Sequence, residues 1–215
     1  MLENEKRELI IYAKKIYDAG LTRGTGGNFS IYNRSEKLMA ITPSGIPYTN
    51  MIEKDIVIMD LHGRVLEGDL KPSSEYMMHT LVYKNREDVN AMIHMHSRFC
   101  TALSTLRISL PAIDYLIAYS GGKEVKVADY ASFGSIELAE NALKTLGNQN
   151  AVLLANHGIN CVAYNMMKAF EIADEMEFCA ELYMRAKAVG EPVILSDNEM
   201  KFMVEKFKEY GQKRD

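Results

Sequence analysis

The stretch Ala151-Val-Leu-Leu-Ala-Asn-His-Gly-Ile-Asn-Cys-Val-Ala163 decides the fold. Its two apolar runs, 151–155 and 159–163, are separated only by an Asn-His-Gly turn. Two strands joined by so short a turn pair side by side in opposite directions. The same pattern of strand, turn and strand recurs at 56–60 and 64–66. We therefore expect a sheet that is largely antiparallel.

Outward from these hairpins, the chain alternates between strand patterns and helical patterns. Apolar residues spaced three and four apart are typical of a helix, and short apolar runs are typical of strands. The helical segments are 1–20, 76–83, 98–106, 135–146, 165–189 and 197–210, and the further strands are 29–32, 38–42, 90–95 and 125–127. Such helices can cover both faces of a sheet. We expect an α/β fold, a three-layer α/β/α sandwich around a mainly antiparallel sheet, built as one domain over residues 1–215.

The composition excludes several classes of protein. With 25 Lys and Arg against 29 Asp and Glu, the formal net charge is -4, which argues against a nucleic-acid binder with a basic face. The hydrophobic fraction of 47% excludes disorder of the bulk of the chain. Apolar runs reach about five residues against the ~20 of a membrane span, so we expect no membrane partner.

Cysteine usage and the N-terminus point to the cytoplasm. The three cysteines, Cys100, Cys161 and Cys179, are odd in number, widely spaced and without a CxxC pair. This pattern is typical of a reducing compartment rather than of a disulfide framework. The first residues carry no apolar segment behind a basic start, as a secretory signal would. We therefore expect a cytoplasmic protein.

Three of the five histidines are candidate metal ligands. His94 and His96 are two apart in a strand pattern, which places both imidazoles on one face with Cα atoms roughly 7 Å apart. His157 occupies the Asn-His-Gly turn of the hairpin. Three imidazoles with one open position form a catalytic zinc site. The alternative is a chance pair with each ring bonded to a local carbonyl, because the pattern alone does not bring His157 close.

A glycine-rich segment, Gly24-Thr-Gly-Gly-Asn28, follows the first helix. Its glycines allow backbone N–H groups to turn inward around an anion. It is not a P-loop, since no Lys-Ser or Lys-Thr follows, and it leads into a strand rather than the helix of a dinucleotide fingerprint. A flexible connection between helix and strand is an equally good interpretation.

Two further turns offer hydroxyl groups. Thr42-Pro-Ser-Gly45 ends a strand, and Pro72-Ser-Ser-Glu75 precedes a helix whose N-terminal amides suit a phosphate. The carboxylate of Glu75 could cap that helix, which is the commoner use, or could act as an acid and base. His79 is most simply a residue on the flank of the same helix, and His62 is most simply exposed in its turn.

Taken in order, the five motifs GTGGN, TPSG, KPSSE, HMH and NHG resemble the class II aldolase and adducin family. The similarity extends over nearly the whole chain. It includes segment 113–118, which precedes Gly121 and Gly122, as well as segment 129–134 and the tail 205–211. Two departures stand beside it: Asp114 replaces a histidine of the aldolases, and GTGGN replaces a common GTAGN form.

The resemblance implies a class II aldolase fold with one Zn²⁺ in each subunit of a cyclic homotetramer, and sites at the subunit junctions. The implied zinc ligands are His94, His96 and His157, and Glu75 would be both the catalytic carboxylate and a ligand at rest. Tyr115 would donate a proton to the aldehyde oxygen across a subunit boundary, and Tyr210 would close over the site. The implied phosphate-binding residues are Gly27, Asn28, Ser44, Gly45, Ser73 and Ser74.

The implied activity is that of a lyase on small sugar phosphates. A zinc-dependent aldolase of this kind reversibly cleaves L-fuculose 1-phosphate, or a close ketose 1-phosphate, to dihydroxyacetone phosphate and L-lactaldehyde. A ribulose-5-phosphate 4-epimerase carries Asp after the two serines, so Glu75 favours the aldolase. A methylthioribulose-1-phosphate dehydratase can carry Glu there and stays an alternative. A non-catalytic adducin-like module lacks the intact histidine set and is the weakest alternative.

Overall fold

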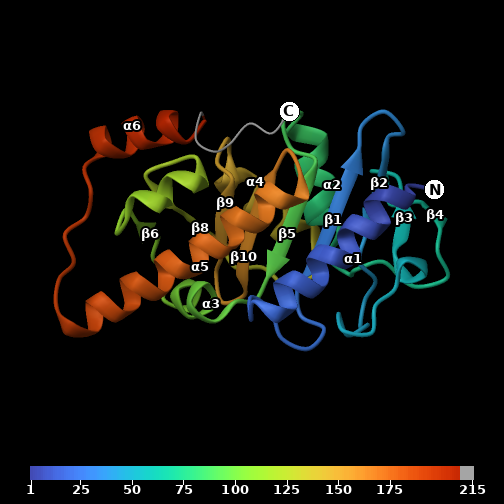
Figure 1. Cartoon of the computed structure of the whole chain (residues 1–215), viewed down its shortest axis with the longest axis horizontal. Helices are drawn as coiled ribbons and strands as arrows, with labels where there is room; N and C mark the ends of the chain where they lie inside the picture. The colour runs from blue at the N-terminus through green and yellow to red at the C-terminus, as the bar shows by residue number, and fades with distance from the viewer. Residues whose placement is uncertain (209–215) are drawn as a thin grey trace.

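The structure is a computed structural model, and it describes residues 1–208 (Figure 1). The helices are α1 Glu3–Asp18, α2 Tyr76–Asn85, α3 Arg98–Thr105, α4 Ile136–Leu146, α5 Met166–Val189 and α6 Asp197–Lys208, with 3-10 turns η1 Glu53–Asp55 and η2 Tyr115–Ser120. The strands are β1 Asn28–Asn33, β2 Leu38–Ile41, β3 Val57–Met59, β4 Val65–Glu67, β5 Ala91–Met95, β6 Leu110–Pro111, β7 Glu124–Val125, β8 Val127–Ala128, β9 Ala151–Leu154 and β10 Gly158–Ala163.

The main sheet of the described chain has the strand order β4-β3-β2-β1-β5-β10-β9-β8. All of its neighbouring strands are antiparallel except β8 and β9, which are parallel. The hairpin of β9 and β10 pairs Leu154 with Gly158, and the turn closes where the His157 N–H donates to the Leu154 carbonyl at 3.0 Å. The prediction of a mainly antiparallel sheet is therefore confirmed.

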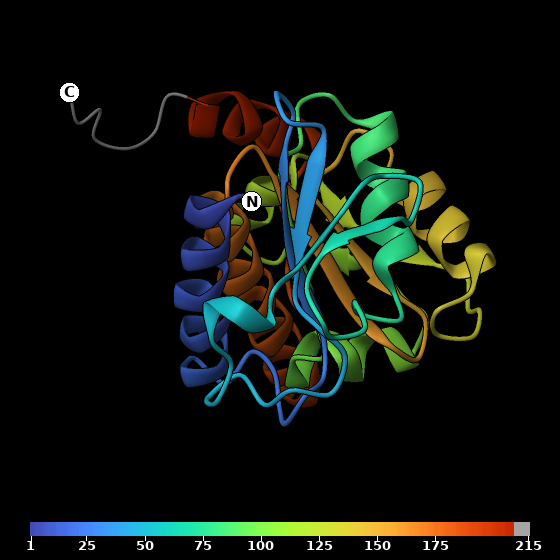
Figure 2. The ribbon, with the colours of Figure 1, turned by 90° about the vertical axis from the view of Figure 1, so that its right-hand side faces the viewer.

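Helices cover both faces of this sheet. Figure 2 shows α1 (blue) and α5 (orange) on one side, with α2 (green) and α4 (yellow) on the other. Polar caps set some of the helix starts: the Ser135 side chain accepts from the Leu138 N–H before α4, and the Asn165 side chain accepts from the Lys168 N–H before α5. The three-layer α/β/α arrangement is confirmed.

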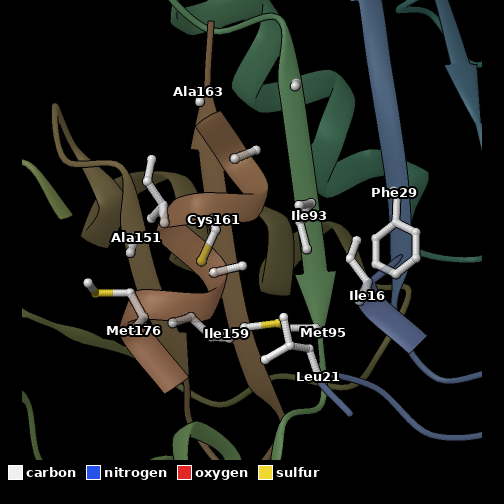
Figure 3. Close-up of a cluster of buried hydrophobic side chains, with 14 of the residues drawn as sticks. Ile16, Leu21, Phe29, Ile93, Met95, Ala151, Ile159, Cys161, Ala163 and Met176 are labelled. Atoms are coloured by element: carbon white, nitrogen blue, oxygen red, sulfur yellow. The ribbon is translucent and has the colours of Figure 1, made fainter. Parts of the chain in front are cut away.

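Alternation along the strands divides the apolar side chains between two cores. On β5, Ile93 and Met95 face the core beneath α1 and α5, whereas Met92 faces the core beneath α2 and α4. Figure 3 shows the first of these cores, in which Ile93 and Met95 lie with Ile159 and Cys161 of the neighbouring strand. Full burial stabilises such side chains by about 1.5–3 kcal/mol each. The alternation leaves His94 on the α2 side.

The structure differs from the sequence prediction mainly between residues 107 and 128. The single expected strand at 125–127 is two short strands that belong to different sheets: β7 pairs with β6, while β8 joins the main sheet beside β9. The chain turns at Lys126, and a turn over a single residue cannot be seen in the periodic pattern of apolar residues. The short β6 and η2 were not predicted. No helix in the described chain is long and apolar enough to cross a bilayer.

Candidate metal centre and phosphate pocket

A row of three polar side chains crosses the centre of the sheet. His94 on β5 lies in register with Asn28 on β1 and with Asn160 on β10, and directly opposed residues share one face. His94 is fully buried, and its Nδ1 lies 2.8 Å from the Asn160 Oδ1. The Asn160 amide nitrogen faces the sulfur of Met78, so the oxygen accepts and His94 Nδ1 carries the proton. The unprotonated Nε2 of His94 then points into the site.

His96 and His157 converge on that nitrogen. The Nε2 atoms of His94 and His96 are 2.9 Å apart. The ring centroid of His157 lies 4.8 Å from that of His94 and 4.9 Å from that of His96. The hairpin turn between β9 and β10 carries His157 to the end of β5, because β10 is the direct neighbour of β5. The three imidazoles meet, as the sequence allowed but did not establish.

Glu75 completes the cluster instead of capping its helix. It occupies the N-cap position of α2 but makes no side-chain capping bond. Its two carboxylate oxygens lie 3.3 Å from His94 Nε2 and 3.3 Å from His157 Nε2, and Asn28 Nδ2 donates to Oε2 at 3.0 Å. The other oxygen, Oε1, is buried without a hydrogen-bond partner among the described residues. Glu75 therefore offers an oxygen to the same point as the histidines.

Burial controls the charge state of this cluster. It places the pKa of His94 well below its ordinary value and also lowers the pKa values of His96 and His157, the last against the attraction of Glu75. Burial likewise raises the pKa of Glu75, a shift opposed by His157 and by the Asn28 hydrogen bond. Neutral imidazoles present lone pairs, which is the form that binds a metal.

These residues fit a divalent cation. One ligand atom from each of Glu75, His94, His96 and His157 can be chosen so that all lie within 4.8 Å of one another. The Nε2 atoms of His94 and His96, 2.9 Å apart, are close enough to present their lone pairs to one positive centre. Imidazole nitrogen and carboxylate oxygen are ligands that zinc takes. Glu75 Oε1, which lies 3.3 Å from His157 Nε2 and makes no hydrogen bond to the described residues, is a further ligand atom for the cation.

Two glycines let neighbouring strands close around the histidine end of β5. A Cβ on Gly27 would meet the backbone oxygen of His94 closer than 3 Å, and a Cβ on Gly158 would do the same with the Met95 oxygen. Gly27 also has a φ of +76°, in the left-handed region that favours glycine. The Tyr48 hydroxyl donates to the carbonyls of Gly26 and Gly27, which holds the glycine segment in place.

A pocket of about 440 Å³ opens beside the cluster. The structure brings together in its lining all six predicted phosphate-binding residues: Gly27, Asn28, Ser44, Gly45, Ser73 and Ser74. The two serine turns are joined directly, since the Ser74 N–H donates to Ser44 Oγ at 3.2 Å and an isolated bridge pairs Pro43 with Pro72. No lysine or arginine occurs among the described lining residues, so an anion there would be met by hydroxyls, amides and the metal.

The predicted Tyr115 does not join the described lining of this pocket within one chain. Tyr115 begins η2, is 48% exposed, and stacks on Phe207 of α6 with ring centroids 6.1 Å apart. It borders a second pocket of about 590 Å³ and is absent from the described lining of the histidine pocket. Asp114 caps η2 by accepting from the Leu116 N–H at 3.0 Å. Tyr210 lies outside the described residues.

Sequence reasoning missed three residues that surround the cluster. Asn160 orients His94, as described above. Glu177 on α5 accepts from Ser97 Oγ at 2.6 Å and from the N–H groups of Phe99 and Cys100 at 2.8 and 2.9 Å, so it caps α3 directly after His96. No local pattern marks this role, because α5 lies far along the chain.

The third, His79, was predicted on a helix flank, and it does lie on α2, but its burial and its hydrogen bonds were not predicted. Its ring is fully buried and bonded to Asn28 and Ser30. The four-residue spacing from Glu75 was the available signal, because it places both side chains on one face of the helix.

Comparisons with known proteins agree with this geometry. Residues 7–184 match the family described as Class II Aldolase and Adducin N-terminal domain. A 5-deoxy-D-ribulose 1-phosphate aldolase from Bacillus thuringiensis serovar kurstaki is 46% identical over 212 residues, 99% of each chain. An L-fuculose phosphate aldolase from Escherichia coli K12 is 43% identical over 206 residues, 95% of this chain and 94% of that one. A solved L-fuculose 1-phosphate aldolase matches with a TM-score of 0.93 and 52% identity, covering 95% of this chain and 96% of that one.

Proposed function

The chain belongs to the class II aldolase and adducin family, and from this premise we propose that it is a zinc-dependent aldolase of ketose 1-phosphates. The observation that carries the proposal is the convergence of three neutral imidazoles and one carboxylate beside a pocket lined by serines and glycines. A metal site with an adjacent phosphate pocket suits a substrate that is phosphorylated at one end and cleaved near the metal.

His94, His96 and His157 would hold the metal, with Glu75 as a fourth ligand at rest. When bound, a divalent cation supplies Lewis-acid polarisation of the substrate's carbonyl and hydroxyl oxygens, worth several kcal/mol at the transition state. Asn160 keeps His94 in the tautomer that faces the cluster. The glycines beside β5 keep the ligating strand end close to its neighbours.

In the cleavage direction the C3–C4 bond of the ketose 1-phosphate breaks, the C4 hydroxyl loses its proton, and C3 gains one. Glu75 lies between the histidines and the pocket, so its carboxyl group is placed to move the proton at C3. The serines and Asn28 would hold the phosphate, and this non-reacting end fixes the reacting carbons in position. Tyr115 of a neighbouring subunit would serve the C4 oxygen, and Tyr210 would cover the site.

Two ketose phosphates are supported as substrates, one for each group of relatives. L-Fuculose 1-phosphate has six carbons, so its cleavage releases dihydroxyacetone phosphate and L-lactaldehyde. A 5-deoxyribulose 1-phosphate has five and would release acetaldehyde with the same phosphorylated fragment. Relatives named for each substrate are 43% and 46% identical to this chain. The phosphate pocket suits the half that both substrates share.

The test is a product analysis with the zinc-loaded chain. Dihydroxyacetone phosphate is incubated with L-lactaldehyde or acetaldehyde, and each ketose 1-phosphate is incubated alone. We expect carbon–carbon bond formation and cleavage, with the preferred aldehyde identifying the substrate. Loss of water without cleavage would identify a dehydratase, epimerisation without release would identify an epimerase, and no reaction with zinc present would refute the enzyme. Size measurement by light scattering tests the proposed homotetramer.

A further inference from the structure

A buried chain of polar side chains leads from the interior of the α2 layer to the Glu75 carboxylate. Tyr83 OH lies 2.6 Å from Ser30 Oγ, and Ser30 Oγ lies 2.6 Å from His79 Nδ1. His79 Nε2 lies 2.5 Å from Asn28 Oδ1, and Asn28 Nδ2 donates to Glu75 Oε2 at 3.0 Å. No member is more than 6% exposed. Only Glu75 and Asn28 have a part in the proposed reaction, so the rest of the chain has no assigned role.

The hydrogen-bonded chain of side chains exists because polar residues recur at nearly equal distances along α2 and β1. Glu75, His79 and Tyr83 are four apart and share one face of α2, and four helical residues rise by about 6 Å. Asn28 and Ser30 are two apart and share one face of β1, and two strand residues rise by about 6.6 Å. Each polar residue of the helix therefore meets one of the strand in turn.

From Glu75 to Ser30, hydrogen-bond donors can be arranged along this chain in only one way. Asn28 presents its NH₂ to the carboxylate, so its carbonyl oxygen faces His79, whose Nε2 must carry the proton. Burial lowers the pKa of His79 to about 3, so the ring is neutral and its Nδ1 can only accept. Ser30 therefore donates to that nitrogen. The Tyr83 hydroxyl, whose pKa is raised by burial, lies 2.6 Å from Ser30 Oγ and also donates to the Ser30 backbone carbonyl at 3.0 Å.

We propose that His79 is a positioning residue: its neutral ring, protonated on Nε2, holds the Asn28 side chain with its NH₂ group facing Glu75 and the phosphate pocket. An amide can otherwise turn by half a revolution at little intrinsic cost, which would place a carbonyl oxygen against a carboxylate and a phosphate. The hydrogen bonds of Ser30 and Tyr83 keep the His79 proton on Nε2, so the ring can only donate to the Asn28 side chain. The catalytic consequence rests on the proposed function, whereas the tautomer does not.

The tautomer is measured directly in the full, zinc-loaded chain with ¹⁵N-labelled histidine. Ring nitrogens with and without a proton have well-separated ¹⁵N shifts, and loss of one set of signals in His79→Gln assigns this residue. We expect a proton on Nε2 that exchanges slowly with water and does not titrate between about pH 5.5 and about pH 8. A proton on Nδ1, or a ring that titrates in this range, overturns the proposal.

Two substitutions separate positioning from packing. The amide nitrogen of Gln can replace Nε2–H, so His79→Gln should keep kcat/KM within about threefold of the parent. Asn reaches only the Nδ1 position, so His79→Asn leaves the Asn28 carbonyl without its donor and should lower kcat/KM by about tenfold, with weaker inhibition by inorganic phosphate. The control Tyr83→Phe breaks the chain at its far end, leaves the bond to Asn28 intact, and should behave like His79→Gln.

The outcomes distinguish this proposal from the proposed function. If His79→Asn equals His79→Gln per folded molecule, or if Tyr83→Phe is as damaging as His79→Asn, then His79 serves packing alone and the proposal fails. If the parent chain cleaves no ketose phosphate, the proposed function fails while the tautomer measurement still decides the hydrogen-bond direction. If His79→Gln does not fold, the measurement on the parent chain decides, with signals assigned through Tyr83→Phe.

Discussion

Replacing Gly27 by alanine tests whether the metal site depends on the close approach of β1 to β5. The new Cβ would be forced against the backbone oxygen of His94, a residue that also supplies a proposed metal ligand. The Gly27 φ of +76° adds strain, because an alanine in the left-handed region costs about 1–2 kcal/mol. Overpacking of a closed site costs about 1–3 kcal/mol more. We expect Gly27→Ala to lower the free energy of unfolding by about 2–5 kcal/mol.

Two other glycines separate these two contributions. Gly24 lies in the same segment with a φ of +60° and nothing within 4 Å of its Cβ position, so Gly24→Ala carries strain without a clash. Part of its cost is offset, because alanine also restricts the unfolded chain, and we expect a net loss of about 1 kcal/mol. Gly158→Ala carries a clash with the Met95 oxygen, and no positive φ is involved, so we expect a loss of about 1–3 kcal/mol.

The assay has two parts, urea unfolding of the metal-free chain and zinc affinity by competition with a coloured chelator. Gly27→Ala and Gly158→Ala should each weaken zinc binding by about 10- to 100-fold, the range seen when the groups around metal ligands are disturbed. Gly24→Ala should leave zinc affinity unchanged. If Gly27→Ala matches Gly24→Ala in both measurements, the strand approach does not constrain the ligands and the reasoning is wrong.

The remaining predictions concern the ligands, the helix after them and the buried histidine. His94→Ala should abolish zinc content, measured by elemental analysis, and cleavage with it; activity in the metal-free variant would contradict the assignment. Glu75→Gln should retain zinc and lose most of kcat, and an unchanged rate would remove the carboxylate from proton transfer. Glu177→Gln should lower the free energy of urea unfolding by about 1–3 kcal/mol, since three partly buried donors lose a charged acceptor. For His79, burial lowers the folded pKa to about 3, so between about pH 6.5 and 3 the unfolded chain binds a proton that the folded chain does not. The stability that the neutral His79 ring contributes is present above that range and is lost as the pH falls. On going from pH 7.5 to 5, the free energy of unfolding of the metal-free parent should therefore fall by about 2 kcal/mol more than that of His79→Gln. Equal losses would contradict the buried neutral ring.

The strands and helices were predictable where the signal was local. The hairpin of β9 and β10 follows from two apolar runs and a three-residue turn, and such pairing needs no knowledge of the rest of the chain. The strands of segment 107–128 were not predicted correctly, because they are two residues long and the turns between them depend on neighbours in other layers. A strand of two residues has no period to detect.

The candidate site was predictable in pairs and not as a whole. A period of two places His94 of β5 and His96, just past its end, on one face, but the arrival of His157 depends on strand order, which puts β10 beside β5. Glu75 was harder still, because a carboxylate at a helix start has a common local use in capping. Only the partners His94 and His157 across the sheet show that its side chain turns away from the helix. The role of Tyr115 across a subunit boundary stays a prediction, because it depends on a neighbouring subunit and not on local sequence.

The match between α2 and β1 sets the order of contacts in the buried hydrogen-bonded chain. A helix gains about 6 Å in four residues and a strand about 6.6 Å in two, so a step along one element nearly equals a step along the other. Residues of the helix and the strand therefore alternate along it, in the order Glu75, Asn28, His79, Ser30 and Tyr83. The next strand residue on that face, Tyr32, meets Tyr83 as a ring stack with centroids 5.2 Å apart, so the polar contacts end at Tyr83 and His79 is their centre.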